Sequence, residues 1–229
     1  MLLPGSGSDD VFITTAFAEP LTRAGVGLFA PRPRPGPKVA DQLGAELNRA
    51  AVRYGRVLAG GVSLGGHIAT GWALRDPGRC AGLLVALPAW TGVPGDAPAS
   101  AAGIAAARAV GSAGVESALG SARAGAPAWL ADELDRAWRG YGPALADSLR
   151  VAAATPGPGL DELRGLDLPV GVVALTDDPL HPLDVARAWA GALPRAALVT
   201  TTLAAIGRDR RALGRAAVLA WLRADAGLR

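Results

Sequence analysis

The sequence of 229 residues has one cysteine, two histidines and no long apolar run. The lone cysteine, Cys80, excludes an internal disulfide. It lies beside the apolar run 82–87, which indicates a small buried side chain rather than a reactive thiol. No apolar run approaches the roughly 18 residues of a membrane span. The segment 1–5 lacks the basic flank and apolar stretch of a secretory signal. We therefore expect a cytoplasmic protein without a membrane partner.

Lysine is equally scarce, with Lys38 as the only one, so nearly all the positive charge is arginine. The net charge is +3 and the sequence pI is about 9.7. Arg208, Arg210 and Arg211 form the densest basic group, but no stripe of aromatic and basic residues accompanies them. This pattern argues against a nucleic-acid partner. A hydrophobic content of 50% and a mean hydropathy of +0.27 indicate a well-packed globular core.

Short apolar runs alternate with stretches of helical periodicity along the chain, a pattern typical of a mostly parallel sheet covered on both faces. Six runs are candidate strands, namely 1–4, 25–30, 56–60, 82–88, 169–175 and 197–201. Five stretches are candidate helices, namely 11–23, 39–54, 64–75, 182–192 and 208–222. The sequence thus predicts an α/β, doubly wound sheet of about six strands.

The segment 92–165 breaks this alternation. It is rich in alanine and has Pro/Gly-rich borders at 94–95 and 156–159. We predict a helical insertion, so that residues 1–91 and 166–229 form the core and residues 92–165 form a cap.

A Gly-x-Ser-x-Gly motif occupies residues 61–65, between the apolar run 56–60 and a predicted helix. A strand, a sharp turn and a helix are the context in which such a serine becomes a nucleophile, and the flanking glycines let strand and helix approach closely. Ser63 is therefore the candidate nucleophile. The alternative is an unreactive Gly-Ser-Gly turn.

With this motif, the chain resembles the α/β-hydrolase superfamily of the serine-nucleophile type. Residues 2–7 resemble the strand and turn that carry one oxyanion-hole amide, and 61–67 resemble the nucleophile elbow. Residues 92–165 stand where a cap domain is usual, and 172–182 resemble the strand and loop that carry the catalytic acid. The chain starts at what would be the third strand, without the usual N-terminal hairpin. The resemblance implies no metal and no organic cofactor.

The resemblance implies Asp178 as the acid, because it precedes Pro182 in the loop after its strand. Asp177 is the neighbour that could be confused with it, and both could also stabilise a turn. The family places its catalytic histidine after the last strand, but that window, 200–209, contains none. Arg208 stands near the expected position and cannot accept a proton, and Asp209 is a weak base for an alcohol.

Only two histidines could replace the missing base. His67 lies one helical turn beyond Ser63, away from the catalytic edge, and is expected to be structural. His181 follows Asp178 by three residues at the carboxyl edge of the sheet. It could accept a hydrogen bond from Ser63 while Asp178 orients it, or it could cap the helix near Pro182 or line the pocket.

An oxyanion hole would use the backbone amides of Leu64 and Ser6. Gly5, Trp90, Trp138 and Tyr141 are candidate substrate-binding residues, although aromatic residues at helical spacing also pack a cap.

The sequence favours a carboxylesterase- or thioesterase-like enzyme acting on a small apolar ester or related carbonyl compound, with Ser63, His181 and Asp178 as catalytic residues. One alternative keeps the fold but binds a small molecule or performs non-hydrolytic chemistry. Another is a non-catalytic interaction protein, and the mild charge and Ala-rich segment are compatible with a homo-oligomer.

Overall fold

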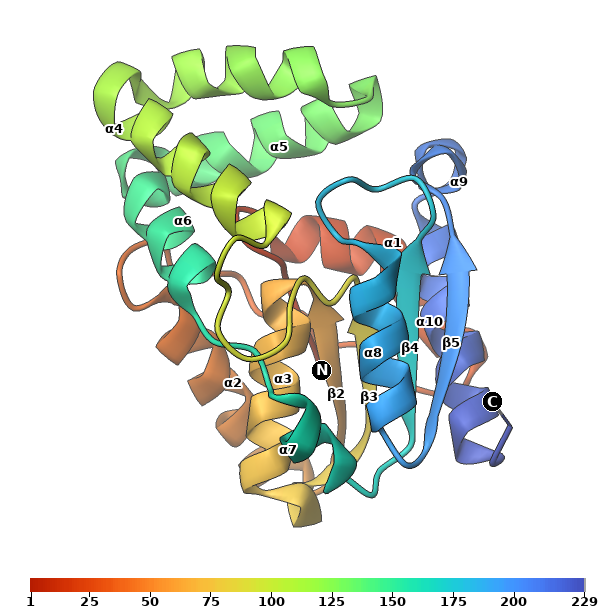
Figure 1. Ribbon diagram of the computed structural model, residues 1–229. Coiled ribbons are helices and arrows are strands. Elements are labelled where there is room, and N and C mark those ends of the chain that lie inside the picture. The colour runs from red at the N-terminus through yellow and green to blue at the C-terminus, as the bar shows by residue number, and fades with distance from the viewer. Residues whose placement is uncertain (229) are drawn as a thin grey trace.

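The computed structural model describes residues 1–228 and has a central sheet that all other elements surround (Figure 1). Five strands, all parallel, form this sheet within the described residues, in the order in which they occur along the chain. They are β1 (Leu2–Leu3), β2 (Val57–Val62), β3 (Cys80–Ala86), β4 (Val170–Leu175) and β5 (Ala196–Thr201). The carboxyl ends of all five strands therefore meet at one edge of the sheet.

Burial explains the composition of the central strands. Every residue of β4 is buried, and its sequence of valine, alanine, leucine and one glycine is an apolar run without alternation. Such runs are typical of parallel strands with helices on both faces. In the register, Val85 of β3 lies opposite Val172 of β4, and Gly61 of β2 lies opposite Leu3 of β1.

Two hydrophobic clusters pack the two faces of the sheet. One includes side chains of α2, α3, α7 and α8, and the other includes side chains of α1, α9 and α10. The helices are α1 (Asp10–Arg23), α2 (Val39–Tyr54), α3 (Leu64–Arg75), α7 (Leu160–Arg164), α8 (Leu183–Ala192), α9 (Leu203–Arg208) and α10 (Arg211–Asp225), with short 3₁₀ turns at Pro77–Arg79 and Gly142–Ala144. This arrangement confirms the predicted α/β doubly wound class.

The predicted helices are reproduced with small shifts. α2 and α3 have the predicted bounds. In α2 the buried residues repeat with clear helical spacing, whereas α3 is buried over most of its length. The predicted helix 208–222 is different, since α10 begins only at Arg211 and the separate short helix α9 precedes it. Thr202 follows the last residue of β5 and caps α9 by accepting a hydrogen bond from the amide of Ala205.

The prediction of a strand at 25–30 is wrong. Residues 26–30 have no regular secondary structure and meet the sheet edge through one backbone hydrogen bond, from the amide of Leu2 to the carbonyl of Phe29. The neighbouring strand β1 has only two residues, so a partner could not form a long ladder there. The sheet consequently has five strands in the described residues instead of about six.

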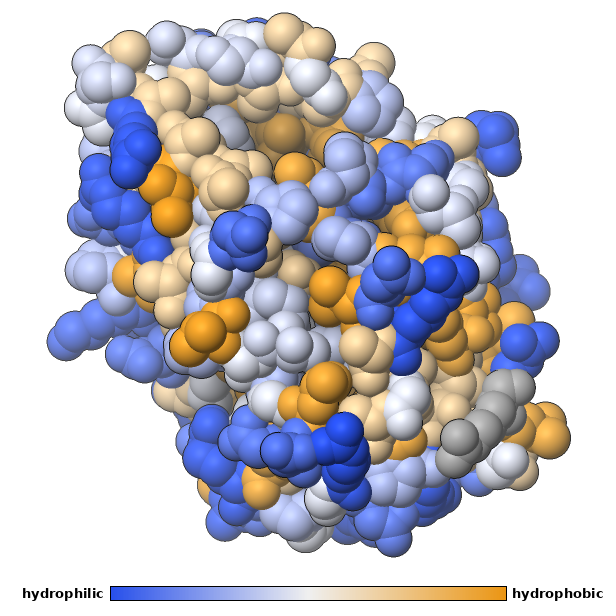
Figure 2. Space-filling view, in the orientation of Figure 1, coloured by the Kyte–Doolittle hydropathy of each residue, from blue (hydrophilic) through white to orange (hydrophobic). Residues whose placement is uncertain are grey.

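A third layer of helices lies over one end of the sheet, at the top of Figure 1. It consists of α4 (Pro98–Gly125), α5 (Ala128–Tyr141) and α6 (Leu145–Ala154), and we call it the α4–α6 layer. It has its own hydrophobic cluster, and α4 is interrupted at Gly114, where φ is +80°. In contrast, α7, at the end of the segment predicted as a cap, packs on the core. The space-filling view shows a hollow below the upper part of α4 (Figure 2).

No helix within residues 1–228 combines the length and the apolar character needed to cross a membrane.

Candidate active site

Ser63 occupies a sharp turn between β2 and α3. Its φ of +50° lies in the left-handed region, which is uncommon for a residue with a side chain and indicates local strain. Its amide donates to the carbonyl of Ala86 on β3, at 2.8 Å, which anchors the turn to the sheet. A Cβ atom on Gly61 or Gly65 would lie 2.4 Å from the carbonyl oxygen of Leu3, so only glycine permits this approach. The turn thus has the geometry of a nucleophile elbow.

The structure brings Ser63, His181 and Asp178 into one hydrogen-bonded chain. Nε2 of His181 lies 3.0 Å from Oγ of Ser63, and Nδ1 lies 2.7 Å from Oδ2 of Asp178. A carboxylate can only accept, so Nδ1 carries the proton and the lone pair of Nε2 faces the serine hydroxyl. The side chains of His181 and Asp178 are 16% and 8% exposed, so the hydrogen bond between them is largely shielded from solvent.

The loop after β4 holds Asp178 in its ionised form. Burial alone would raise the pKa of Asp178, but hydrogen bonds and charge from His181, with the amide of Leu180, outweigh it and hold that pKa below its ordinary value. His181 does not cap α8, whose N-cap is Pro182 without a side-chain hydrogen bond. The neighbouring Asp177 points elsewhere and accepts a hydrogen bond from the amide of Leu203 at the start of α9.

The family resemblance places the catalytic base in the segment after β5, but the residues there are not hydrogen-bonded to Ser63. Arg208 is exposed at the end of α9. Asp209 accepts hydrogen bonds from Arg211 and Arg215, which hold the pKa of its carboxyl below the ordinary range and make it a still weaker base. Neither residue belongs to the hydrogen-bonded chain at Ser63.

His67 is buried, and its ring contacts residues other than the Ser63 side chain. Its Nε2 accepts a hydrogen bond from the amide of Ala89, at 3.1 Å, and its ring stacks on Trp189. Burial, and secondly the nearby His181, lower the pKa of His67 from 6.5 to about 3. The ring is therefore neutral at ordinary pH, in agreement with a structural role.

The two expected oxyanion donors line the same recess. Leu64 begins α3, where the first amides of a helix have no partner within it, and Ser6 lies in the turn after β1. Both residues line a narrow recess that is too tight to hold a water molecule. The recess is also lined by Gly5, Gly7, Val39, Leu43, Tyr141 and Ser148.

Only some of the expected substrate-binding residues reach this recess. Gly5 and Tyr141 line it. Trp138 is buried in the cluster of the α4–α6 layer and approaches Gly7. Trp90 lies edge-on to His67, and its carbonyl accepts a hydrogen bond from the indole of Trp189.

Sequence reasoning missed Val39 and Leu43 on α2 and Ser148 on α6. Oγ of Ser148 accepts from the amide of Gly36 and donates to the carbonyl of Ala144, so its hydroxyl is already engaged. These residues belong to no motif and come from helices about one hundred positions apart. The buried spacing of α2 shows that Val39 and Leu43 face inward, but no sequence signal joins them to α6. Across residues 1–228, no cluster of three or more histidine, cysteine or acidic side chains could hold a metal ion.

Comparison with known proteins identifies the fold. No protein-family profile matches the sequence, and no curated protein matches it. Solved structures do match. A hydrolase from Pseudomonas aeruginosa PA01 has a TM-score of 0.71 at 21% identity, over 96% of this chain and 89% of that chain. MenH from S. aureus has a TM-score of 0.72 at 17% identity, over 98% and 93%.

A thermophilic esterase from Thermogutta terrifontis is similarly close, with a TM-score of 0.69 at 19% identity, over 97% of this chain and 88% of that chain. The similar structures are α/β-hydrolase-fold proteins. The chain therefore has the α/β-hydrolase fold, as its motifs and their order predicted. Identities of this size establish the architecture, and the chemistry has to be argued from the site.

Proposed function

We propose that the protein is a serine hydrolase that cleaves small, largely apolar esters or thioesters. The observation that carries this proposal is the chain of hydrogen bonds from Ser63 through His181 to Asp178. The lack of a histidine after the last strand was the reason to consider a binding protein or non-hydrolytic chemistry. The position of Nε2 of His181, 3.0 Å from the serine oxygen, supports His181 as the base and therefore favours hydrolysis over those alternatives.

In the first half of the reaction, Oγ of Ser63 attacks the carbonyl carbon of the substrate while Nε2 of His181 takes the serine proton. The carbonyl oxygen becomes an oxyanion, and the amides of Leu64 and Ser6 would stabilise it from the adjoining recess. When the tetrahedral intermediate collapses, the bond to the leaving alcohol or thiol breaks and His181 gives its proton to the leaving group. Asp178 keeps the imidazole oriented and stabilises its positive charge.

In the second half, water attacks the acyl group on Ser63, and His181 takes one of its protons. The second tetrahedral intermediate collapses to the carboxylic acid, and the proton on His181 returns to the serine oxygen. The free enzyme is regenerated, so the reaction consumes only the ester and one water.

The recess suggests the size and polarity of the substrate. Its lining combines the turn 5–7 and the apolar side chains of Val39, Leu43 and Leu64 with the hydroxyl-bearing residues Tyr141 and Ser148, and it contains no charged residue. The recess leaves no free space for a water-sized molecule, whereas ordinary ligand sites span roughly 300–1,000 Å³, so a bound acyl group would have to be small and would have to move the lining side chains. Short uncharged acyl groups are therefore the expected substrates.

Labelling with a fluorophosphonate probe tests the chemistry. The wild-type protein should be labelled, and Ser63→Ala and His181→Ala should both lose the label while keeping the native circular dichroism spectrum. Equal labelling of His181→Ala would contradict the proposed base. An unlabelled wild-type protein would instead support a ligand-binding role for the same fold.

A series of p-nitrophenyl esters then tests the substrate. We expect kcat/KM for the acetate to exceed that for the octanoate by an order of magnitude or more, because the longer acyl chain would have to displace the surrounding helices. A higher value for the octanoate would refute the small-acyl specificity but leave the serine mechanism intact.

A further inference from the structure

Helix α5 contacts the turn after β1 at three successive residues. A Cβ atom on Gly7, whose φ is +63°, would lie 2.7 Å from Nε1 of Trp138. The hydroxyl of Tyr141 donates to the carbonyl of Ser8 at 2.8 Å. Asp9 accepts two hydrogen bonds from Arg136, at 3.0 and 2.8 Å. The turn that presents the amide of Ser6 is thus held from outside by a helix of the α4–α6 layer.

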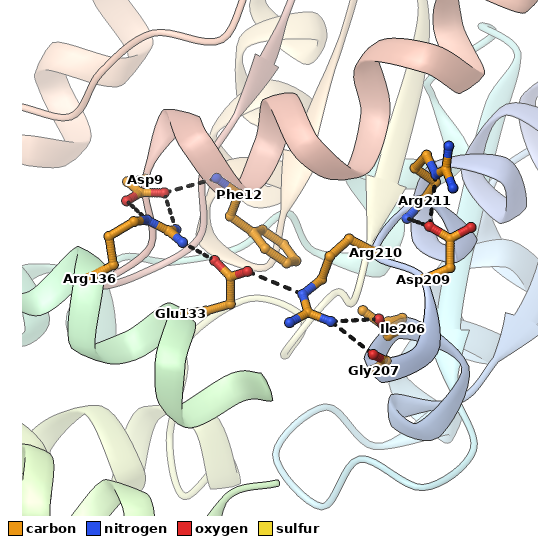
Figure 3. A network of polar contacts seen from close by, with 9 residues as sticks. All are labelled: Asp9, Phe12, Glu133, Arg136, Ile206, Gly207, Asp209, Arg210 and Arg211. Carbon is orange, nitrogen blue, oxygen red and sulfur yellow. Dashed lines mark hydrogen bonds and ion pairs between the residues drawn. The ribbon is translucent and has the colours of Figure 1, made fainter. Parts of the chain in front are cut away.

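The same helix is tied to the other side of the core. Arg136 also pairs with Glu133, and Glu133 accepts from Nε of Arg210 at 3.1 Å (Figure 3). Arg210 donates in turn to the carbonyls of Ile206 and Gly207 at the end of α9. We call this series of contacts, from Asp9 through Arg136 and Glu133 to Arg210, the α5 clasp.

Most side chains of the α5 clasp are less exposed to solvent than those of an ordinary surface ion pair. The side chains of Asp9 and Glu133 are 16% exposed, that of Arg210 is 21% exposed and that of Arg136 is 38% exposed, so solvent screens the pair of Glu133 and Arg210 less than the pairs of Arg136. Arg210 also lies over the ring of Trp129 at 4.5 Å, which adds a cation–π contact between α5 and the core. Burial, and then the charges of Asp9 and Asp10, raise the pKa of Tyr141, so its hydroxyl stays protonated as a donor.

We propose that Arg136 and Tyr141 are positioning residues, and that α5 holds the turn 5–8 in the conformation that presents the Ser6 amide to the oxyanion. This inference rests on the proposed hydrolase function. It implies that the α4–α6 layer and the oxyanion hole are coupled. When the clasp opens, the turn relaxes and one oxyanion donor is lost, and when it closes, the donor returns.

Arg136 is the better residue for a test because Tyr141 also lines the recess. The variant Arg136→Gln removes the link to Asp9 without touching that lining. Arg139→Gln is the matched control. Arg139 lies on the same helix and also makes two ion pairs, but its partners, Asp135 and Glu116, belong to the α4–α6 layer.

Steady-state kinetics with a short-chain ester is the first measurement. Complete loss of an oxyanion donor costs about 100- to 1,000-fold in kcat, so a displaced donor should cost on the order of tenfold. We expect that loss in kcat for Arg136→Gln, with KM within about twofold, because a transition-state contact is weakened and ground-state binding is not. Arg139→Gln should keep both constants within about twofold of wild type. Equal effects of the two variants would overturn the proposal.

A double-mutant cycle shows whether the effect runs through Asp9. Asn caps helices as well as Asp does, so Asp9→Asn keeps the hydrogen bond that Asp9 accepts from the amide of Phe12. It removes the charge that faces Arg136, and it replaces the Oδ2 atom that accepts from Nε of Arg136 with an amide group that cannot accept. The double variant Asp9→Asn/Arg136→Gln should be no slower than the slower single variant. Multiplied losses would contradict the shared route.

Hydrogen exchange of the peptide that covers residues 4–12 gives a readout that needs no activity. The amide of Ser8, which donates to the carbonyl of Gly5 at 3.1 Å, should exchange faster in Arg136→Gln and unchanged in Arg139→Gln. Unchanged exchange in Arg136→Gln would overturn the coupling even in an active enzyme. A wild-type protein without esterase activity would refute the proposed function, while the exchange data still decide whether α5 holds the turn.

Discussion

At the residue scale, the base and the acid of the proposed triad come from a single loop. Asp178 and His181 are three positions apart, whereas Ser63 lies more than one hundred positions earlier. The short spacing lets Asp178 hold the histidine ring and accept the amide of Leu180 at the same time. The neighbouring Asp177 is engaged with α9, so two adjacent carboxylates have separate tasks.

Because the two carboxylates have different partners, Asp178→Asn and Asp177→Asn should affect kcat differently. Asp178→Asn should lower kcat by several orders of magnitude, because a neutral amide no longer fixes the tautomer of His181. Asp177→Asn should leave kcat within a few fold, because an amide oxygen can still accept the hydrogen bond from Leu203. Ester hydrolysis by the two purified variants checks this, and a larger loss in Asp177→Asn would reverse the assignment.

His67 gives a prediction for stability against pH. Its pKa is about 3 in the folded protein, against 6.5 when unfolded, so the unfolded chain binds the proton more readily below pH 6.5. The free energy of unfolding should therefore fall on acidification, by on the order of 1–2 kcal/mol between pH 6.5 and 5 from this group alone. His67→Gln, which can still accept from Ala89, should lack this component in urea unfolding at the two pH values. An identical pH dependence in both proteins would show that His67 is not held neutral.

At the element scale, the strand–turn–helix unit around Ser63 was predictable from sequence because its glycines and apolar run form one local pattern. Strands β3 and β4 were predictable for the same reason, since both faces are buried. The run 26–30 has similar composition, yet it lies outside the short strand β1 and forms no ladder. Whether the run 26–30 pairs as a strand depends on the length of β1, which the sequence of the run itself does not encode. The same limit applies to the recess, where α2 and α6 meet only in the folded chain.

Two glycines of α3 should respond in opposite ways to alanine. Gly65→Ala places a methyl group 2.4 Å from the backbone carbonyl of Leu3, and we expect a loss of about 1–3 kcal/mol from overpacking. At Gly71 the nearest atom is the end of the flexible Arg75 side chain, at 3.6 Å, so Gly71→Ala should gain about 0.5–1 kcal/mol from helix propensity. Denaturant unfolding measures both, and a stabilised Gly65→Ala would contradict the close approach of α3 to β1.

At the scale of the whole molecule, the sheet has two packed faces and the α4–α6 layer has a separate cluster. Polar contacts such as the α5 clasp contribute to the join between this layer and the core. Elements with their own small core and a polar boundary open below the free energy of global unfolding. The interruption of α4 at Gly114 weakens this layer further.

Native-state hydrogen exchange should reveal that difference. Amides of α4 and α5 should open with free energies below those of β3 and β4, and only the strands should reach the global value. Equal opening energies in both regions would show that the layer and the sheet unfold as one unit.

The placement of His181 and Asp178 on one loop also has a mechanical consequence. A drift of that loop carries base and acid together, so their mutual alignment survives. The one distance that changes is the gap to the serine. In the proposed triad, a small displacement of β4 relative to β2 therefore changes one distance, that from Nε2 of His181 to Oγ of Ser63, and this distance would decide whether the serine is activated.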